Sequence, residues 1–400
     1  MEWEKLTSDL CLPTETKIVL LVIDGLGDLP VQGKTALETA HIPHLDDLAF
    51  RSTCGLTHPV FPGITPGSGP AHLSLFGYDP MKYILGRGIL EALGVGVRVG
   101  TKDMVARGNF ATLKNDLITD RRAGRIPTEE NARLCQEVNK KIAIIKGIKA
   151  ELFPGKEHRF VLKLSGSGLS DELTDADPQK ENKKRVATIP KSSKAEMSAE
   201  IVNSFTDQIT DILKSSPKAN TILLRGFSKY PSLPSMKELF RLNPAALAQY
   251  PMYKGLAKLV GMEILDGGQD LEALITALEK HYASFDFFYI HVKKTDSCGE
   301  DGRFKDKVKA IEETDSIIPR ILSLNPDVFV VTSDHSTPCL LKGHSWHPNP
   351  ICLHAKTALP DRVATFTERA CSQGYLGIFR AIFAMPLMLA HAGKLKKFGA

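Results

Sequence analysis

The chain has 400 residues, 42% of them hydrophobic, so it can bury a large core, and its length favours two or three domains. Its 51 basic and 46 acidic residues nearly balance, which argues against a general nucleic-acid-binding protein, because such a protein gathers basic residues on one face. Its seven cysteines form no C-x-x-C pair, which argues against a zinc ribbon or a disulfide framework and favours reduced cytosolic thiols.

The N-terminal stretch MEWEKLTSDLCLPTETK contains acidic residues and no long apolar core, so we expect neither a signal peptide nor a membrane anchor there. No other stretch reaches the roughly 18 to 20 apolar residues that a membrane helix requires. We therefore expect a cytoplasmic protein without a membrane partner.

The first domain is predicted from short apolar runs that alternate with helical patterns. Continuous apolar runs, rather than strict alternation, are typical of parallel strands buried on both faces. Strand and helix in repeated succession predict an α/β fold, a mostly parallel sheet sandwiched by helices through right-handed crossovers. In chain order, the predicted elements are strand 17–24, helix 42–50, helix 271–282, strand 285–292, helix 305–322 and strand 327–334.

The middle of the chain has a different composition, richer in basic residues and polar loops. TDRRAGRIPTEE at 119–130 belongs to it, and Thr128 followed by two glutamates indicates a helix start. The run KENKKR at 180–185 is interpreted as a solvated loop, because charge runs are usually exposed.

This middle part also contains candidate strands at 159–164 and 221–226. We predict that it is a second α/β domain, inserted into the first one and covering residues 111–249. The flanking segments, 1–110 and 250–400, then form one discontinuous domain.

The stretch TPGSGPAHLSLFGYDP at 65–80 starts small and flexible and turns abruptly apolar. Gly67 and Gly69 bracket Ser68, which has two interpretations. A serine at a helix start is commonly a cap, because its hydroxyl satisfies free backbone amides. A serine with an activating group next to its hydroxyl can instead be a nucleophile. This stretch alone leaves both interpretations open.

Each of the three central strands is followed by residues of the kind that bind metals. Asp24 follows the first strand, Asp296 lies a few residues after the second, and the pair Asp334 and His335 follows the third. In an open parallel sheet these ends converge on one crevice, which is the usual ligand site. An aspartate at one strand end can also cap the next helix. Three strands with this feature favour a common site.

The loop KGHSWHPNPI at 342–351 adds His344 and His347 close in sequence to Asp334 and His335. A mixed set of carboxylate oxygens and imidazoles suits divalent ions such as manganese or zinc. The alternative for these histidines is a plain surface position, which we favour for His347 only.

Nine stretches, spread in order over residues 19–351, together resemble the cofactor-independent phosphoglycerate mutases of the archaeal type, in the alkaline phosphatase superfamily. They are VLLVIDGLGD, GKTALETAHIPHLDDLA, TPGSGPAHLSLFGYDP, GRGILEALG, DRRAGRI, LLRGFSKYPSLPSM, YPMYKGLAKLVGME, HVKKTDSCGEDGRFKDKVKAIEETD and TSDHSTPCLLKGHSWHPNPI. The resemblance implies an alkaline phosphatase-like catalytic domain and an inserted domain that grips the substrate.

The resemblance also implies roles for individual residues. Ser68 matches the nucleophile that becomes phosphorylated. The ligands of one metal match Asp24, Ser68, Asp334 and His335, and those of the second match Asp296 and His344. The family's third ligand of the second metal is a histidine four positions after the aspartate, where this chain has Glu300.

This departure has two interpretations. A ligating Glu300 would shift the metal preference toward manganese or magnesium, because its oxygen is a harder donor than imidazole. A Glu300 that points away would leave a weaker or remodelled second site, with His347 as a substitute ligand.

The resemblance implies two divalent ions, with Mn²⁺ favoured and Mg²⁺, Co²⁺ or Zn²⁺ as alternatives, and no 2,3-bisphosphoglycerate. The partner is a small phosphorylated hydroxy acid, because the family interconverts 3-phosphoglycerate and 2-phosphoglycerate. Guanidinium groups suit both the carboxylate and the phosphate of such a substrate. The candidates for substrate binding are Arg87, Arg107, Arg121, Arg122, Arg125, Arg225, Lys254 and His72. For each cation the alternative is a surface role, and for His72 it is packing beside the helix.

Three activities stay open at this point. The first is the mutase reaction through a phosphoserine. The second is a phosphatase or phosphotransferase of the same superfamily that acts on another small phosphate ester, or a kinase-like relative that acts on a hydroxy acid, although the chain has no G-x-x-x-x-G-K-[ST] loop. The third is a metal-binding protein without catalysis, for which Glu300 is the only argument. The sequence does not determine the oligomeric state.

Overall fold

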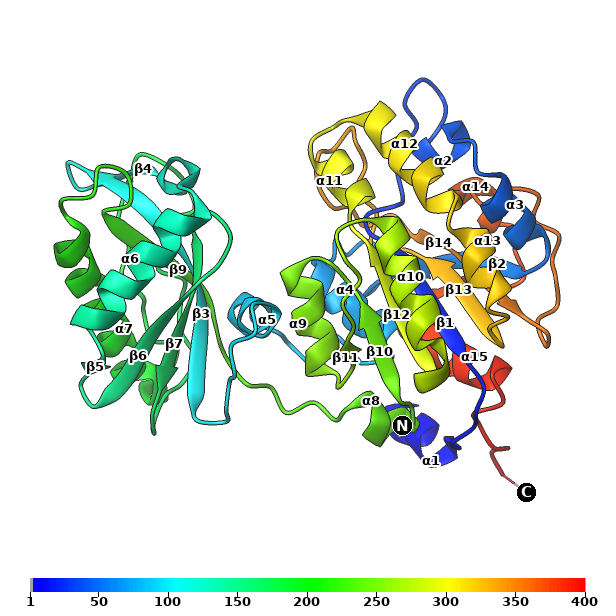
Figure 1. The fold of residues 1–400 in the computed structure, drawn as a ribbon, viewed down its shortest axis with the longest axis horizontal. Helices are drawn as coiled ribbons and strands as arrows, with labels where there is room; N and C mark the ends of the chain where they lie inside the picture. The colour runs from blue at the N-terminus through cyan, green and yellow to red at the C-terminus, as the bar shows by residue number, and fades with distance from the viewer. Residues whose placement is uncertain (1–2, 400) are drawn as a thin grey trace. The chain divides into compact units, whose positions relative to one another are not determined.

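The computed structural model describes residues 3–399 and divides the chain into two compact units (Figure 1). Unit 1 comprises the chain up to Ile84 and from Leu233 onward, and unit 2 comprises Leu85–Ser232. The second unit is therefore inserted into the first, but both of its ends lie earlier in the chain than the expected range 111–249.

Two packing relations explain the shifted boundaries. Helix α5 (Arg87–Gly94) packs against β3 (Asp103–Lys114) and β9 (Thr221–Lys229), so all three belong to unit 2. Strand β10 (Pro244–Leu247) pairs with β12 (Phe287–Val292) and thus completes the sheet of unit 1. Local composition does not reveal which sheet a short strand joins.

The described residues of unit 1 form an eight-stranded sheet with the order β11-β10-β12-β1-β13-β14-β2-β15. Only β14 runs antiparallel to its neighbours, so the predicted mostly parallel sheet is confirmed. The three strands predicted from continuous apolar runs are adjacent and form its centre. The further bounds are β1 (Ile18–Ile23), β2 (Thr53–His58), β11 (Glu263–Ile264), β13 (Val328–Thr332), β14 (Asn349–Ala355) and β15 (Gly377–Arg380).

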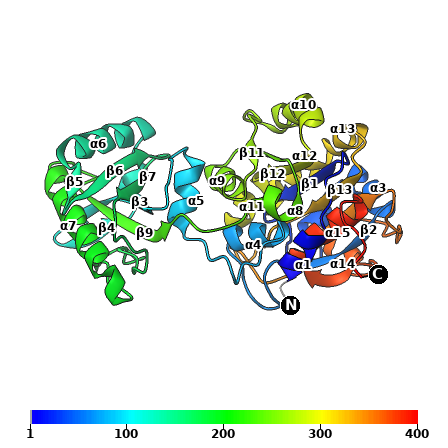
Figure 2. The same ribbon diagram turned by 90° about the horizontal axis from the view of Figure 1, so that it is seen from below.

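Helices lie on both sides of this sheet (Figure 2). Val19, Leu21 and Ile23 of β1 belong to a buried core with side chains of α3, α10, α12 and α13. In Figure 2, α1, α4 and α15 lie on the opposite side. The helix bounds are α1 (Trp3–Leu10), α2 (Ala36–Thr39), α3 (Pro43–Phe50), α4 (Ser68–Leu75), α8 (Met236–Phe240), α9 (Pro251–Leu259), α10 (Leu271–His281), α11 (Lys294–Glu300), α12 (Phe304–Asp315), α13 (Ile318–Ser323), α14 (Glu368–Cys371) and α15 (Ala384–His391).

The single helix predicted at 305–322 is wrong, because the structure has two helices there, α12 and α13. Pro319 lies in the first turn of α13. Proline has no amide hydrogen to donate and is tolerated in a first turn, where the amide needs no partner within the helix. The chain therefore starts a new helix at Ile318 instead of continuing the old one.

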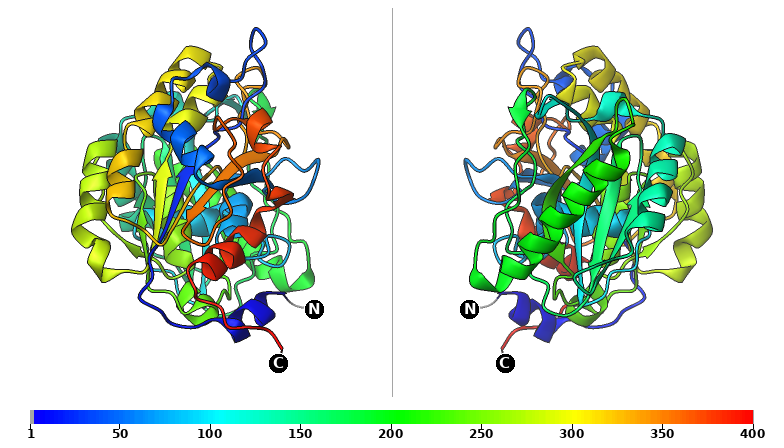
Figure 3. Two further views of the ribbon diagram at one scale, coloured as in Figure 1. Left: turned by 90° about the vertical axis from the view of Figure 1, so that its right-hand side faces the viewer. Right: turned by 90° about the vertical axis from the view of Figure 1, so that its left-hand side faces the viewer.

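Unit 2 is built on an antiparallel sheet with the order β5-β6-β7-β3-β4-β8, and β9 pairs with β3. Helices α6 (Thr128–Lys141) and α7 (Glu196–Leu213) pack on this sheet (Figure 3). Their apolar side chains share one core with those of β3, β6 and β7. The helix start predicted at Thr128 is confirmed, and so are the strands predicted at 159–164 and 221–226. The remaining bounds are β4 (Leu117–Asp120), β5 (Ile144–Ile145), β6 (Ile148–Pro154), β7 (Arg159–Ser165) and β8 (Lys183–Lys184).

Two features predicted from composition can be compared with the structure. All seven cysteines are free and buried. Within residues 3–399, none of the helices combines the length and the apolar character needed to cross a membrane.

Candidate active site

Ser68 is the first residue of α4, and Gly67 before it occupies the N-cap position with extended backbone. No side-chain capping hydrogen bond forms at this N-cap, because glycine has no side chain. The Ser68 Oγ instead lies 3.3 Å from Nε2 of His335. The serine thus stands at a helix start, as the capping interpretation expects, but its hydroxyl is directed to a potential metal ligand.

Asp24, Asp334 and His335 form a first group of candidate ligands, which we call cluster 1. Asp24 directly follows β1, and Asp334 and His335 follow the neighbouring parallel strand β13 with one residue between, so the sheet itself brings them together. The Nε2 atom of His335 lies 3.3 Å from Oδ1 of Asp24 and 3.1 Å from Oδ2 of Asp334. All three side chains are fully buried.

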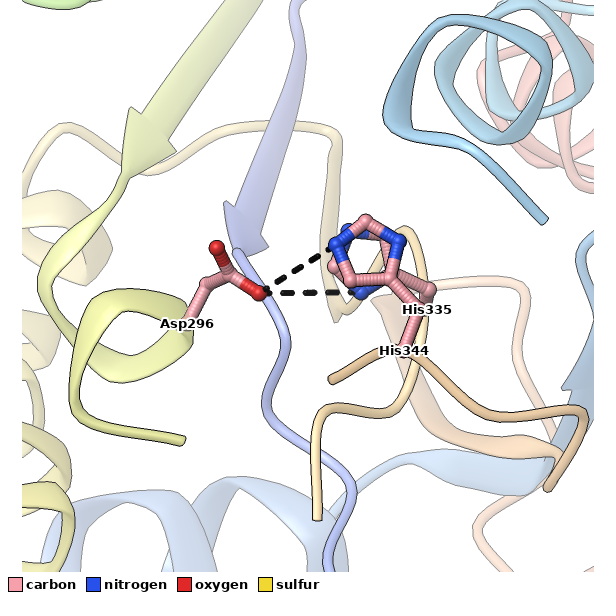
Figure 4. A group of neighbouring side chains, drawn as sticks. All are labelled: Asp296, His335 and His344. Atoms are coloured by element: carbon pink, nitrogen blue, oxygen red, sulfur yellow. Dashed lines mark ion pairs between the residues drawn. The ribbon is translucent and has the colours of Figure 1, made fainter. Parts of the chain in front are cut away.

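Asp296, His335 and His344 form a second group, cluster 2, which shares His335 with cluster 1 (Figure 4). The two imidazole rings stack with their centroids 3.6 Å apart. Oδ1 of Asp296 faces both, at 3.7 Å from Nε2 of His344 and 4.0 Å from Nδ1 of His335. Asp296 is buried in α11, whereas the side chain of His344 is 22% exposed.

The donors of the two clusters fit divalent metal ions. Oδ1 of Asp24 and Oδ2 of Asp334 are buried and accept no hydrogen bond from the described residues. A buried carboxylate oxygen without such a bond is costly unless a cation compensates it. Carboxylate oxygens combined with imidazole nitrogens suit manganese, zinc and related ions.

Three donors converge on the other oxygen of Asp24, Oδ2. The Tyr253 hydroxyl donates to it at 2.5 Å, His291 Nε2 lies at 3.2 Å, and the Lys293 ammonium lies at 3.0 Å. Lys293 also pairs with Oδ2 of Asp296. One lysine therefore joins the carboxylates of both clusters and leaves an oxygen of each to face the histidines.

The carboxylates of the site and the positive groups beside them shift one another's pKa. Burial opposes charge on Asp24, but the hydrogen bond from His291 and the charge of Lys293 hold the pKa of this carboxyl well below its usual value. Burial likewise opposes protonation of His335, but Asp334 and Asp24 raise its pKa to about 9. Both shifts express attraction between the carboxylates and nearby positive charge.

The backbone turns sharply after Asp24 and requires glycine there. Gly25 has φ +63°, and a Cβ atom on it would lie 2.6 Å from Oγ1 of Thr337 and 2.7 Å from Asp296. Thr337 donates to Oδ1 of Asp296 at 2.6 Å and contacts Nδ1 of His335 at 3.0 Å. A side chain at position 25 would thus push into the ligands of cluster 2.

His72 lies behind Ser68 in a closed, aromatic environment. It is fully buried, and its Nδ1 lies 2.9 Å from the Ser68 carbonyl oxygen and 3.3 Å from Oδ2 of Asp334. Its ring contacts those of Tyr253 and Tyr289. Burial lowers the pKa of His72 to about 4, so this imidazole is neutral at ordinary pH. Of the two interpretations of His72, the structure favours packing beside the helix over phosphate contact.

The candidate cations of unit 2 fall into two sets. Arg87, Arg107 and Arg225 line one cavity together with Asn109 and Leu223.

The second set follows β4. Arg121 forms a two-pronged ion pair with Asp177, at 3.0 and 2.6 Å, while Arg122 and Arg125 are exposed. In unit 1, Lys254 lies half-buried in α9, directly after Tyr253.

Comparison with known proteins identifies the family. A family model described as 2,3-bisphosphoglycerate-independent phosphoglycerate mutase matches residues 49–219. A protein of Thermosipho africanus, named as a probable enzyme of this kind, is 54% identical over 99% of both chains. Its counterpart in Thermus thermophilus is 49% identical over 98% of both chains. The chain belongs to this mutase family.

Two solved structures agree with this membership. A protein from Pyrococcus horikoshii matches with a TM-score of 0.83 and 29% identity, over 96% of this chain and 99% of the other. A cofactor-independent phosphoglycerate mutase from Thermoplasma acidophilum matches with a TM-score of 0.73 and 30% identity, over 94% and 100% of the two chains. The resemblance and the α/β fold expected from the sequence are therefore confirmed.

Mutase membership makes the chain an isomerase, and it implies divalent metal ions without 2,3-bisphosphoglycerate. Against this background the position of Glu300 is notable. It is the last residue of α11, its side chain is exposed, and it belongs to neither cluster. His347 is also outside both clusters, with its Nδ1 3.0 Å from Oγ of Ser345. The structure thus brings neither proposed third ligand to Asp296 and His344.

The sequence pattern alone did not identify the residues that contact the candidate ligands. Tyr253, His291, Lys293 and Thr337 all contact Asp24 or Asp296. Each lies in a stretch that carries the family resemblance, and Lys293 precedes Asp296 by less than one helical turn. Polar residues inside those stretches were therefore a signal that could have identified them as site residues. The sequence does not show which carboxylate each one contacts, because most of these contacts join distant parts of the chain.

Proposed function

We propose that this mutase interconverts 3-phosphoglycerate and 2-phosphoglycerate through a phosphoserine at Ser68. The observation that carries the proposal is the position of the Ser68 Oγ, 3.3 Å from the histidine that both clusters share. A nucleophilic serine needs an activating group next to its hydroxyl, and the two clusters of candidate metal ligands beside Ser68 provide the place for one.

The residues of cluster 1 and cluster 2 would hold two divalent ions, and Mn²⁺ is the ion that we propose. When bound, such ions lower the pKa of a coordinated hydroxyl and stabilise the oxygens of a phosphoryl group during in-line transfer. The protein's own groups orient the candidate ligands and favour the phosphate. Tyr253, His291 and Lys293 orient the carboxylates, and the free amides at the start of α4 favour a phosphate on Ser68.

The substrate carries a carboxylate and a phosphate, which guanidinium groups recognise through paired hydrogen bonds. We propose Arg87, Arg107 and Arg225 as its principal binding residues, because they line one cavity of unit 2. Arg121 would first have to leave Asp177, and Arg225 would have to leave Asp175. Arg122, Arg125 and Lys254 complete the set as cations that an anionic substrate can attract.

The reaction requires that glycerate stays bound while Ser68 holds the phosphate, because water would otherwise hydrolyse the intermediate. Retention of the phosphate distinguishes a mutase from a phosphatase that uses the same ligands. A cytoplasmic location stays a prediction.

The proposal is tested with purified protein, Mn²⁺ and 3-phosphoglycerate, without 2,3-bisphosphoglycerate, while phosphorus NMR follows the products. We expect 2-phosphoglycerate without free phosphate. Free phosphate as the main product would replace the mutase by a phosphatase, and no turnover with any of Mn²⁺, Mg²⁺, Co²⁺ or Zn²⁺ would contradict catalysis.

The phosphoserine is tested separately by rapid acid quench and peptide mass spectrometry. Phosphate is expected on the peptide that contains Ser68 and is expected to be absent from the same peptide of a Ser68→Ala variant. A phosphopeptide from another part of the chain would contradict the assignment.

A further inference from the structure

Tyr253 stands in the core of unit 1 with its hydroxyl among the charged groups of the site. It lies in α9, it is fully buried, and its ring stacks on that of His291 with centroids 3.7 Å apart and an interplanar angle of 28°. A ring held in this way has one orientation, so the position of its hydroxyl is fixed by packing.

The hydroxyl has three polar neighbours. It donates to Oδ2 of Asp24 at 2.5 Å, and it accepts from the Lys293 ammonium at 3.2 Å. It also lies within hydrogen-bonding reach of the Ser68 side chain. A phenol has one hydrogen to donate and two lone pairs to accept with, so Asp24, Lys293 and Ser68 together use its full capacity.

We propose that Tyr253 is a positioning residue of the mutase, which aligns the Ser68 hydroxyl and the Asp24 carboxylate. This inference rests on the proposed function of Ser68. Through its contact with the Ser68 side chain, the phenol holds the serine next to Asp24. Because it saturates Oδ2 of Asp24, the other oxygen, Oδ1, is left for an ion.

The neighbouring Tyr289 shows what a merely structural tyrosine looks like in the same place. It is also fully buried, and the centroid of its ring lies 4.8 Å from that of Phe76 and 5.6 Å from that of His72. Its hydroxyl, however, has no hydrogen-bond partner among the described residues. Two tyrosines with equal burial thus differ in the single feature that the inference depends on.

The experiment compares Tyr253→Phe with the matched control Tyr289→Phe, both of which keep the ring and remove only the hydroxyl. Outer-shell partners of metal ligands typically contribute a factor of about 10 to 100 in activity or metal affinity. We expect Tyr253→Phe to lower kcat by that factor, with KM for 3-phosphoglycerate and the melting temperature unchanged. Tyr289→Phe is expected to keep kcat within about twofold of the wild type, because it removes no hydrogen bond.

A second measurement needs no turnover. Titration of the protein with Mn²⁺, followed by electron paramagnetic resonance of the free ion, gives the affinity of each class of site. We expect Tyr253→Phe to weaken the class that contains Asp24 about tenfold and Tyr289→Phe to leave both classes unchanged.

The inference is overturned when Tyr253→Phe matches Tyr289→Phe in both kcat and Mn²⁺ affinity. A fall in kcat that is explained by a raised KM also contradicts it, because alignment of the nucleophile acts after the substrate is bound. Failure of the proposed function looks different, since wild-type protein would then yield no 2-phosphoglycerate or no phosphate on Ser68.

Discussion

Cluster 1 and cluster 2 share a histidine but differ in how completely the protein holds their other ligands. In cluster 1, both aspartates are fully buried, and three donors fix Oδ2 of Asp24. In cluster 2, there is one carboxylate, and His344 is partly exposed at the end of a hydrogen bond to the Pro66 carbonyl oxygen. The first cluster has two negative charges available for an ion and the second has one.

This difference indicates that the two clusters would bind their ions with unequal affinity. A pre-oriented, buried carboxylate pair binds an ion without paying for ordering of the ligands, whereas a partly exposed imidazole competes with water for its place at the ion. We therefore expect a tighter Mn²⁺ site at cluster 1 and a weaker one at cluster 2. Four substitutions test this contrast.

Ser68→Ala should have the largest effect on activity, because it removes the proposed nucleophile, next to which both clusters lie. We expect mutase activity to fall by at least about 10⁴-fold, the range seen when a catalytic nucleophile is lost. Ser74→Ala is the control on the same helix, since Ser74 is buried and its hydroxyl has no partner among the described residues. Initial rates with 3-phosphoglycerate measure both, and substantial activity in Ser68→Ala would contradict the phosphoserine.

Asp334→Asn tests cluster 1. The amide keeps the shape but removes one of the two negative charges, so we expect loss of the tighter Mn²⁺ class and a fall in kcat of about 10²- to 10³-fold, comparable to the loss of a preorganised electrostatic partner. Equilibrium titration with Mn²⁺ measures the stoichiometry. Retention of two ions with unchanged affinities would contradict a role for Asp334 in binding an ion.

His344→Gln tests cluster 2 and should have a smaller effect. We expect the weaker Mn²⁺ class to lose about 10- to 100-fold in affinity while the tighter class stays unchanged. Activity should then return at high Mn²⁺ concentration, which a misfolded variant would not show. Equal weakening of both classes would mean that the clusters bind their ions as one unit.

Glu300→Gln should have the smallest effect, because the side chain is exposed and lies outside both clusters. Surface substitutions change the free energy of unfolding by about 0.5 kcal/mol or less. Because Glu300 contacts neither cluster, we expect both Mn²⁺ affinities to stay within about twofold of the wild type. A selective loss at the weaker class would show that Glu300 turns inward to take the place of the family's histidine.

The central sheet and the position of its polar residues could be predicted from the sequence. The runs that became β1, β12 and β13 are mostly apolar and buried, and such runs are typical of parallel strands covered on both faces. Because parallel strands end at one edge, the residues after them had to meet there. Asp24 was therefore predictable as a neighbour of Asp334 and His335, although it lies more than 300 residues from them in the chain.

The position of Glu300 could not be predicted from helical spacing alone. Asp296 and Glu300 are four residues apart on α11, a spacing that places side chains on the same helical face. The helix ends at Glu300, and its last residue is exposed while Asp296 is buried. Spacing gives the direction of a side chain, but depth in the protein depends on what covers that part of the helix.

The sequence by itself determined the family, the parallel core of unit 1 and the aspartates and histidines that meet at its strand ends, because each follows from local pattern or from a contiguous motif. Only the tertiary structure decided which groups surround those ligands. Tyr253 reaches Asp24 from a helix more than 200 residues away, and Lys293 bridges Asp24 and Asp296. The physical reason is that hydrogen bonds and ion pairs act over a few ångströms, so their partners are fixed by the packing of distant elements.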